Sequence, residues 1–349
     1  MRDVVYTIGY SGYRPREFVE EIRRIGVELV ADIRRFPRSS IAGFTALELA
    51  ESLRDAGIRY KWLGELGALG VRGPRAGCSE SATFDRYVWR LYHTADALLA
   101  LHDLLEAAAR AKTAVLCREA NWRSCHRQFV ADALTAAGFR VVHIYKGRAE
   151  PHSPTACFGE TRIPPRGLLE KALADFSRLC GAGRSVYLFG GALDGPARDV
   201  DVVVYGEWRG DLPEGYDAQI LLRPLPTLFH YLVLRTGVLL CGEPLAPDRR
   251  IVEAEQADSL ARLFRNSDDP VAVCKSFKEL LYLAGLLCCG AMGAANWRRL
   301  GACLAGLGIA APGEFKDCLT PPPAGVLRAS GEPLLDKVLG LVSQCGTSR

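Results

Sequence analysis

The first 147 residues alternate between short apolar segments and amphipathic helical segments, and this alternation constrains the fold more than any other feature. Segments of strand character cover residues 4–10, 27–36, 58–64, 113–119 and 140–147. Helical segments cover residues 14–26, 45–57, 84–111 and 125–138. Strands joined through helices pair in parallel, because the helix returns the chain to the edge where it began. The sequence therefore predicts an α/β domain with a mainly parallel sheet and helices on both faces.

The rest of the chain divides at a stretch rich in proline and polar residues, which is typical of a linker. The sequence predicts an α/β domain over residues 1–150, a linker over 151–167, a second domain of α+β type over 168–245, and a helical tail over 246–349. Four basic side chains lie on helical stretches of the tail: Lys275, Lys278, Arg298 and Arg299. They are candidates for contacts with the base of a nucleotide or with the acceptor of a transferred group, but a solvated basic face is the simpler interpretation.

Composition excludes several classes of protein. The longest uncharged run, residues 280–297, contains three glycines and predicts a buried helix rather than a membrane span. We therefore expect a cytoplasmic protein without a membrane partner. The net charge of +4 lies in residues 1–160, which carry 23 basic and 19 acidic residues, and this mild excess is no nucleic-acid signature.

Twelve cysteines at scattered positions do not form the framework of a small secreted protein. Asn and Gln are scarce, and Met occurs twice. A shortage of thermolabile residues is typical of a thermophile, and intracellular disulfides occur in hyperthermophiles. We therefore expect a thermophilic source, although a GC-rich genome would also raise the content of Arg and Ala.

Two aspartates, Asp199 and Asp201, stand one residue apart in an apolar segment predicted to be a strand. Side chains alternate along a strand, so we expect both carboxylates on one face. Their repulsion favours a divalent cation between them, and Asp217 begins the next apolar segment, where it can complete the site. Gly190 and Gly191 precede the pair and can bring backbone N–H groups close to a phosphate. The simpler alternative is an acidic strand end beside a tight turn.

The order of a helix, a strand, a Gly-Gly loop, an Asp-Val-Asp strand and a strand with a third Asp resembles the nucleotidyltransferase superfamily of the polymerase-beta type. The resemblance covers about residues 170–245 and implies transfer of a nucleoside monophosphate from a nucleoside triphosphate with Mg²⁺ or Mn²⁺. It implies that Asp199 and Asp201 hold the metal on the triphosphate, and that Asp217 holds a second metal and activates the acceptor hydroxyl.

The acceptor stays open, and a protein hydroxyl, a small molecule and an RNA end are all compatible with the sequence. Two departures from the family pattern stand out: Gly191 replaces the usual small hydroxyl residue, and the loop before Asp199 is shorter than in the common form. The alternative is an inactive domain that binds a nucleotide or a partner and regulates the first domain.

In the first domain, reactive side chains follow two predicted strands. Cys117 and Glu119 lie at the end of one strand, and Asp32 and Arg34 lie at the end of another. The next helix begins with Cys125, His126 and Arg127, where the helix dipole favours anions and lowers the pKa of a thiol. Ligands bind at the carboxyl edge of such sheets, so we expect these segments to converge.

The motifs TIGYS, DIRRFPRS, GIRYKWLGELGALG and LCREANWRSCHRQFVADAL span most of residues 4–147 and resemble the family called domain of unknown function 488. The resemblance implies an α/β fold and no particular activity. The residues that match its motifs are Asp32, Arg34, Pro37, Cys117, Glu119, Cys125, His126 and Arg127.

Several interpretations of this edge stay open. The favoured one is an anion or nucleotide site formed by Arg34, Arg127 and the helix end. The spacing of Cys117 and Arg123 matches a phosphatase or rhodanese loop, which predicts a thiol-dependent hydrolase. Cys117, Cys125 and His126 suit zinc, although a fourth ligand is not visible. A purely structural role, with buried cysteines and with Arg34 paired to Asp32 or Glu119, is the remaining alternative.

Overall fold

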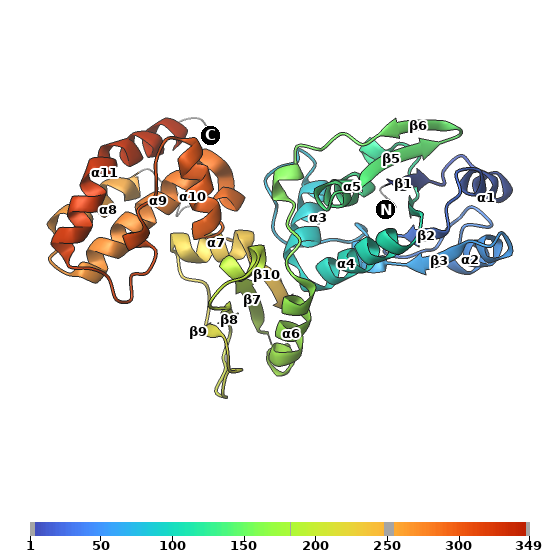
Figure 1. The fold of residues 1–349 in the computed structure, drawn as a ribbon. Coiled ribbons are helices and arrows are strands. Elements are labelled where there is room, and N and C mark those ends of the chain that lie inside the picture. The colour runs from blue at the N-terminus through green and yellow to red at the C-terminus, as the bar shows by residue number, and fades with distance from the viewer. Residues whose placement is uncertain (1–3, 182, 248–254, 347–349) are drawn as a thin grey trace. The chain divides into compact units, whose positions relative to one another are not determined.

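A computed structural model describes residues 4–181, 183–247 and 255–346, and the chain forms two compact units (Figure 1). The first is Met1–Asp175 and the second is Phe176–Arg349. The division falls at the end of helix α6 (Arg166–Phe176), beyond the expected linker. The beginning of α6 is held to the first unit because Arg166 bonds Asp103 and Glu106 at 2.9 and 3.0 Å.

The first unit contains a six-stranded sheet in the order β3-β2-β4-β1-β5-β6. Its strands are β1 (Val4–Gly9), β2 (Leu29–Asp32), β3 (Arg59–Trp62), β4 (Thr113–Cys117), β5 (Arg140–Tyr145) and β6 (Arg148–Pro151). Strands β1 to β5 pair in parallel, and β6 pairs with β5 in the antiparallel sense. The predicted α/β architecture with a mostly parallel sheet is confirmed.

Helices cover the sheet as the alternation predicts. They are α1 (Pro15–Arg24), α2 (Ala46–Asp55), α3 (Ala82–His93), α4 (Ala95–Arg110) and α5 (Arg127–Ala136). Phe18 of α1 and Leu49 of α2 share a buried cluster with Ile8 and Leu116 of the sheet. Helix α5 contacts β1, β4 and β5. Residues that alternate with Leu116 along β4, including Cys117, point to the opposite face of the sheet from that cluster.

One long helix was expected over residues 84–111, and this prediction is wrong. Two helices, α3 and α4, meet at Thr94, whose backbone is extended at φ −127° and ψ 138°. A β-branched residue loses little in that conformation. The Thr94 hydroxyl donates to the Arg90 carbonyl at 2.8 Å, and Arg90 also pairs with Asp96 in the first turn of α4. These polar contacts tie the two helices together across the break.

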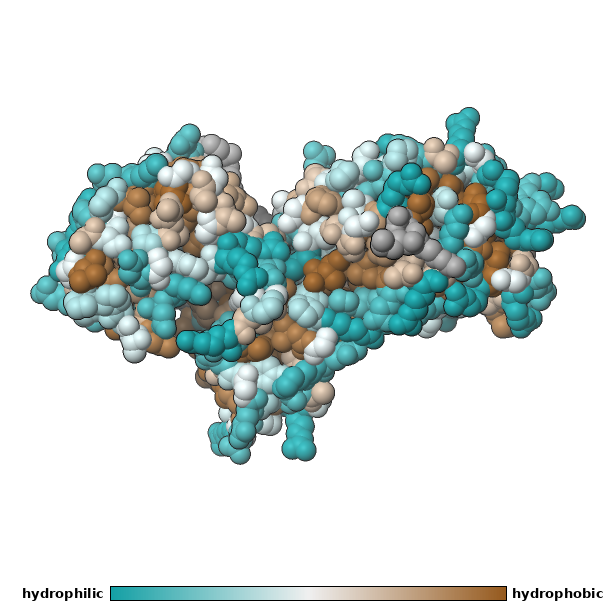
Figure 2. All heavy atoms as spheres, in the orientation of Figure 1, coloured by the Kyte–Doolittle hydropathy of each residue, from teal (hydrophilic) through white to brown (hydrophobic). Residues whose placement is uncertain are grey.

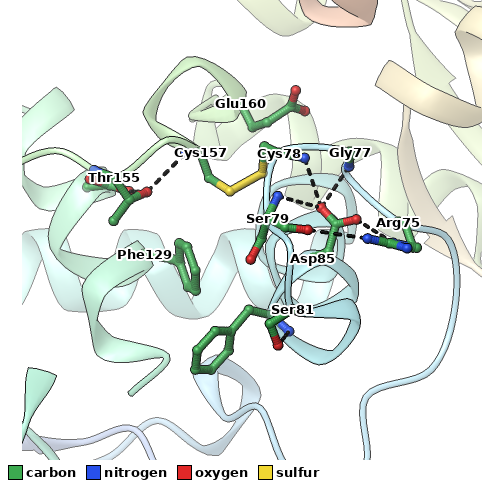
Figure 3. Close-up of a disulfide and its surroundings, with 12 residues drawn as sticks. Arg75, Gly77, Cys78, Ser79, Ser81, Asp85, Phe129, Thr155, Cys157 and Glu160 are labelled. Atoms are coloured by element: carbon green, nitrogen blue, oxygen red, sulfur yellow. Dashed lines mark hydrogen bonds and ion pairs between the residues drawn. A yellow bond between two sulfur atoms is a disulfide. The ribbon is translucent and has the colours of Figure 1, made fainter. Parts of the chain in front are cut away.

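The segment after β5 is fastened to the first unit rather than extended away from it. Residues 148–151 form the edge strand β6, which the sequence interpretation left inside a connection. Cys157 forms a disulfide with Cys78 (Figure 3). The loop that carries Cys78 is held by Asp85 of α3, which accepts hydrogen bonds from the N–H groups of Gly77, Cys78 and Ser79 and from Arg75.

The second unit contains a four-stranded sheet in the order β10-β7-β8-β9. Its strands are β7 (Ser185–Phe189), β8 (Asp201–Tyr205), β9 (Asp217–Leu221) and β10 (Val238–Cys241). Strand β7 runs antiparallel to β8 and β10, and β8 runs parallel to β9. Helix α7 (Leu228–Thr236) precedes β10. The sequence analysis named no strand over residues 238–241 and therefore missed β10.

The C-terminal region is helical, as predicted. It consists of α8 (Glu255–Asn266), α9 (Pro270–Gly293), α10 (Trp297–Gly306) and α11 (Ala324–Gly346). Asp269 caps α9 by accepting the N–H of Val271 at 3.0 Å, and Pro270 occupies the first turn. Phe264, Phe277 and Phe315 form the aromatic centre of this helical core.

The apolar helix α9 is a core helix of the second unit. Within the described ranges, no single helix has the length and the apolar composition needed to cross a membrane; only α9 and α10 together, bent by 111°, meet that test. Most of the visible surface of the molecule is hydrophilic, with small hydrophobic areas between (Figure 2). A cytoplasmic location and a thermophilic source stay predictions.

Ten of the twelve cysteines form five disulfides: Cys78–Cys157, Cys180–Cys241, Cys274–Cys318, Cys288–Cys345 and Cys289–Cys303. Four of the five lie in the second unit. The remaining two cysteines, Cys117 and Cys125, are free and buried. The unpaired thiols are therefore the two that the sequence interpretation placed at a candidate site.

Candidate functional site

An acidic edge lies where β8 and β9 of the second unit begin. Asp201 and Asp217 are paired residues of these parallel strands, so their side chains leave the sheet on the same face. The pKa of Asp201 is raised to about 6, first by burial and then by the charges of Asp217 and Asp199. The charges of Asp217 and Asp199 therefore oppose ionisation of Asp201, and the cation site expected from the sequence stays a prediction.

Asp199 differs from its predicted position. Strand β8 begins at Asp201, so Asp199 lies in the preceding loop and is exposed. Its carboxylate accepts hydrogen bonds from the Arg198 guanidinium at 3.1 and 3.3 Å. The assumption that both aspartates occupy one strand is wrong. The backbone ladder extends only to Val200, whose carbonyl accepts the N–H of Asp217.

Gly190 lies directly against the acidic edge. Its φ of 81° falls in the region that favours glycine, and a Cβ at this position would stand 2.1 Å from the Asp201 Oδ2. Gly191 begins a short 3₁₀ turn, Gly191–Asp194, and a Cβ there would meet only Ala197, at 3.9 Å. The two glycines therefore differ. A side chain at Gly190 would collide with the Asp201 carboxylate, whereas the space at Gly191 could hold one.

The loop between β7 and β8 is held by the beginning of α10. The Asp194 carboxylate accepts two hydrogen bonds from Arg299, both at 2.8 Å, and one from the side chain of Asn296. Arg298 donates to the carbonyls of Asp194 and Pro196 at 2.9 and 3.1 Å. Two of the four basic tail residues, the exposed Arg298 and the partly buried Arg299, therefore fasten this loop through hydrogen bonds.

Helix α9 brings a cation to the acidic edge. The Lys278 ammonium donates to the Lys316 carbonyl at 2.8 Å and interacts electrostatically with Asp201. Burial lowers the pKa of Lys278, and the charges of Asp317 and Asp201 oppose that shift. The phenol of Tyr282, one turn further along α9, has a raised pKa because of burial and the Asp201 charge. The edge thus has the half-buried Asp201 and Lys278 beside the exposed Asp199 and Asp217.

In the first unit, Asp32 and Arg34 form a buried ion pair. The Asp32 carboxylate is fully buried and accepts hydrogen bonds from the Arg34 guanidinium at 2.5 to 3.0 Å and from the Tyr60 hydroxyl at 2.7 Å. Arg34 also donates to the Phe44 carbonyl at 2.8 Å, and its guanidinium lies over the Tyr10 ring. This geometry fits the structural alternative, in which Asp32 balances the charge of Arg34.

Arg127, the first residue of α5, is also buried and bonded to the protein. Its guanidinium donates to the carbonyls of Glu119 and Ala120 at 2.5 and 2.8 Å, while its Nε–H lacks a partner among the described residues. Gly9 at the end of β1 makes room for this contact, because a Cβ there would lie 1.7 Å from the Glu119 carbonyl oxygen. Of the two arginines expected to bind an anion, Arg34 is therefore paired within the fold, and Arg127 is anchored to two backbone carbonyls with its Nε–H left over.

Cys117, Cys125 and His126 converge beyond the end of β4. The His126 Nδ1 lies 3.7 Å from the Cys117 Sγ and 3.9 Å from the Cys125 Sγ. The Cys117 thiol also donates to the exposed Glu119 carboxylate at 3.4 Å. Burial raises the pKa of the Cys125 thiol well above its usual value, and Cys117 adds to the shift. The expected lowering by the helix N-terminus is therefore outweighed by desolvation.

Arg123 does not turn back toward Cys117. Its guanidinium bonds Glu150 of β6 and lies 4.3 Å from the centre of the Trp122 ring. In a phosphatase-type loop, the arginine and the backbone surround an oxyanion beside the nucleophilic thiolate. The observed direction of Arg123 gives no support to that interpretation.

A chain of hydrogen-bonded buried side chains in the first unit was not predicted from the sequence. The Thr7 hydroxyl contacts the His143 Nδ1 at 2.6 Å, the His143 Nε2 contacts the His152 Nδ1 at 2.9 Å, and the His152 Nε2 contacts Asp132 at 2.9 Å. Trp122 stacks on His143 with ring centres 4.0 Å apart. These residues come from separate elements without a local motif, so no sequence signal connects them.

Comparison with known proteins supports a resemblance in the first unit. A family model described as domain of unknown function DUF488 matches residues 14–134. The match covers none of the second unit and carries no activity. No curated protein and no solved structure matches the chain.

Proposed function

We propose that the second unit transfers a nucleoside monophosphate from a nucleoside triphosphate to an acceptor hydroxyl, with Mg²⁺ or Mn²⁺ held by Asp199, Asp201 and Asp217. The paired positions of Asp201 and Asp217 on parallel strands carry this proposal. The acceptor oxygen attacks the α-phosphorus, and the bond from that phosphorus to the bridging oxygen of the β-phosphate breaks. Pyrophosphate leaves with the bond electrons, and the hydroxyl proton passes to Asp217.

The donor set fits a hard divalent cation. Carboxylate oxygens are the ligands that Mg²⁺ prefers. The pKa of Asp201 is raised first by burial and then by the negative charges of Asp217 and Asp199, which a bound cation would offset. Asp199 can join the site only if its carboxylate leaves Arg198. When bound, the cation would neutralise phosphate charge and favour departure of pyrophosphate.

The residues around the carboxylates have separate roles in this proposal. Gly190 gives the triphosphate a close approach to the backbone beside Asp201. Arg299 keeps the loop in place through Asp194. Lys278 supplies a positive charge near Asp201 that can attract the phosphates. Gly191 has no hydroxyl, so one phosphate contact of the common family pattern is missing.

The test is a transfer assay on the full chain. The protein is incubated with Mg²⁺ or Mn²⁺, each α-labelled nucleoside triphosphate, and a cell extract as the source of acceptors. We expect the wild type to transfer label and Asp199→Asn/Asp201→Asn to transfer none. Nucleotide binding without transfer by the wild type would contradict the transferase and support the regulatory alternative. An absence of binding would leave the aspartates as an acidic strand end.

A further inference from the structure

We propose that Cys117, Cys125 and His126 form a zinc site in the first unit, separate from the nucleotidyl transfer proposed for the second. The Sγ atoms of both cysteines and a ring nitrogen of His126 all lie within 4.8 Å of one another. Of the residues that the structure describes, these are the only three His, Cys, Asp or Glu side chains with ligand atoms grouped in this way.

The orientation of His126 fits a metal ligand. Its Nδ1 faces the two sulfurs, and its Nε2 lies 3.3 Å from the Ile33 carbonyl oxygen. That carbonyl can only accept, so the contact favours the tautomer with the proton on Nε2 and a lone pair on Nδ1. Histidine ligands of metals commonly donate their other N–H to a carbonyl or carboxylate in this way. The Tyr87 ring, 5.1 Å from the imidazole, packs edge-on against it.

The oxidation state of the cysteines is a second, independent observation. All ten other cysteines are paired in disulfides, whereas Cys117 and Cys125 are free although both lie beside His126. Two neighbouring thiols in a chain so rich in disulfides would be expected to pair unless another role keeps them apart. Coordination of one metal ion by both sulfurs supplies that role, and each thiol releases its proton to solvent on binding.

The ligand types favour zinc over the cations proposed for the second unit. Thiolate and imidazole are soft or borderline ligands and suit Zn²⁺, whereas Mg²⁺ requires oxygen. Cys117, Cys125 and His126 are 3%, 2% and 8% exposed, so the site is closed on the protein side. Glu119, the nearest carboxylate to Cys117, is exposed. Three protein ligands leave the fourth tetrahedral position open, as in catalytic zinc sites.

The neighbouring arginines argue against an anion at the same place. Arg34 is paired with Asp32, and Arg127 donates to two backbone carbonyls, so a single buried Nε–H of Arg127, rather than a free guanidinium, is left for an anion. A divalent cation would instead balance the charge of the two thiolates that form when it binds. We therefore favour a metal ion over an anion as the ligand of this edge.

Metal binding is measured on the full chain without reductant, so that the five disulfides stay intact. The protein is stripped with a chelator, loaded with Zn²⁺ or Co²⁺, and freed of unbound ions. We expect about one zinc per chain by elemental analysis. With Co²⁺ we expect a sulfur-to-cobalt charge-transfer band together with the visible bands of a tetrahedral ion. Zinc should also protect Cys117 and Cys125 from alkylation, as mapped by mass spectrometry.

Variants separate this site from adventitious binding. Cys117→Ser, Cys125→Ser and His126→Gln should each lose most of the zinc, with circular dichroism as the check on folding. Cys180→Ser/Cys241→Ser removes two cysteines of the second unit and is the matched control, which should bind zinc as the wild type does. A Cys117–Cys125 disulfide in the purified protein, or wild-type cobalt spectra without a sulfur band, would overturn the proposal even if a variant failed to fold. Nucleotidyl transfer is measured separately and does not enter this result.

Discussion

Asp201 and Asp217 occupy paired positions on the neighbouring parallel strands β8 and β9, and the negative charge of Asp217 raises the pKa of Asp201, which burial already raises. Two carboxylates on neighbouring strands would repel each other only weakly if water surrounded both. Asp201 is half-buried, so water screens its repulsion from Asp217 less. Like charges on adjacent strands normally destabilise a sheet. This arrangement is therefore a cost to folding that a bound cation would remove.

Asp201→Asn should stabilise the metal-free protein at neutral pH while it abolishes transfer. The pKa of Asp201 is raised from 3.8 to about 6, so the folded state holds more protons than the unfolded state between these values. The free energy of unfolding of the wild type therefore falls as the pH rises through this window. We expect Asp201→Asn to gain roughly 1 kcal/mol at pH 8 after allowance for solvent screening, and nothing near pH 3.

Denaturant unfolding of the second unit in the presence of a chelator at both pH values measures this difference. Asp258→Asn, at an exposed position on α8, is the control and should change little at either pH. An equal gain at low and neutral pH would show that charge on Asp201 is not the cause.

The two glycines of the loop should respond differently to the same substitution. Gly190→Ala places a methyl group 2.1 Å from the Asp201 Oδ2 at a φ of 81°, and we expect a loss of about 1–3 kcal/mol and of transfer activity. Gly191→Ala meets only Ala197 at 3.9 Å and should keep the stability within about 0.5 kcal/mol. Thermal unfolding and the transfer assay on both variants check this, and equal losses would contradict it.

Arg299→Ala should loosen the loop between β7 and β8. It removes two hydrogen bonds to the Asp194 carboxylate, which is mostly buried, while the Asn296 side chain still donates to that carboxylate. We expect a loss of about 1–3 kcal/mol in the free energy of unfolding and faster amide exchange over residues 191–199. Arg262→Ala, an exposed change on α8, is the control. Unchanged exchange in the loop would argue against the clamp.

Asp85→Asn should weaken the loop that carries Cys78. Burial alone would raise the pKa of Asp85, but hydrogen bonds from Arg75 and from the N–H groups of Cys78, Ser79 and Gly77 hold it below its ordinary value. The resulting stability is present above the unfolded pKa and is lost as the pH falls through the lower folded value. We expect a deficit of about 1–3 kcal/mol at pH 7 that shrinks in acid.

Urea unfolding at pH 7 and near pH 3 measures the Asp85 contribution, with the Cys78–Cys157 disulfide verified by mass spectrometry. Asp55→Asn, whose side chain is 75% exposed, is the matched control and should be neutral at both pH values. A deficit that grows in acid would contradict the assignment.

The periodicity of the sequence determined the larger elements of the first unit. Strands β1 to β5 and helices α1, α2 and α5 follow from apolar alternation and helical spacing, because those patterns depend only on which side of an element is buried. The same argument placed Cys117 and Asp32 at the carboxyl ends of their strands. It could not find the break at Thr94, since helical character continues on both sides and only the packing of α3 and α4 decides where the chain turns.

Tertiary structure decided everything that depends on distance between elements. The sequence brought Cys117, Cys125 and His126 to one edge, but the fold turned the His126 Nδ1 to the sulfurs and engaged Arg34 and Arg127 elsewhere. Other contacts also join residues far apart in the chain. They are the five disulfides, the hydrogen-bonded chain from Thr7 to Asp132, and the hydrogen bonds that Arg299 and Asn296 donate to Asp194. Composition and local spacing report burial and backbone conformation, whereas contacts between distant residues arise only when the packed elements fix their separation.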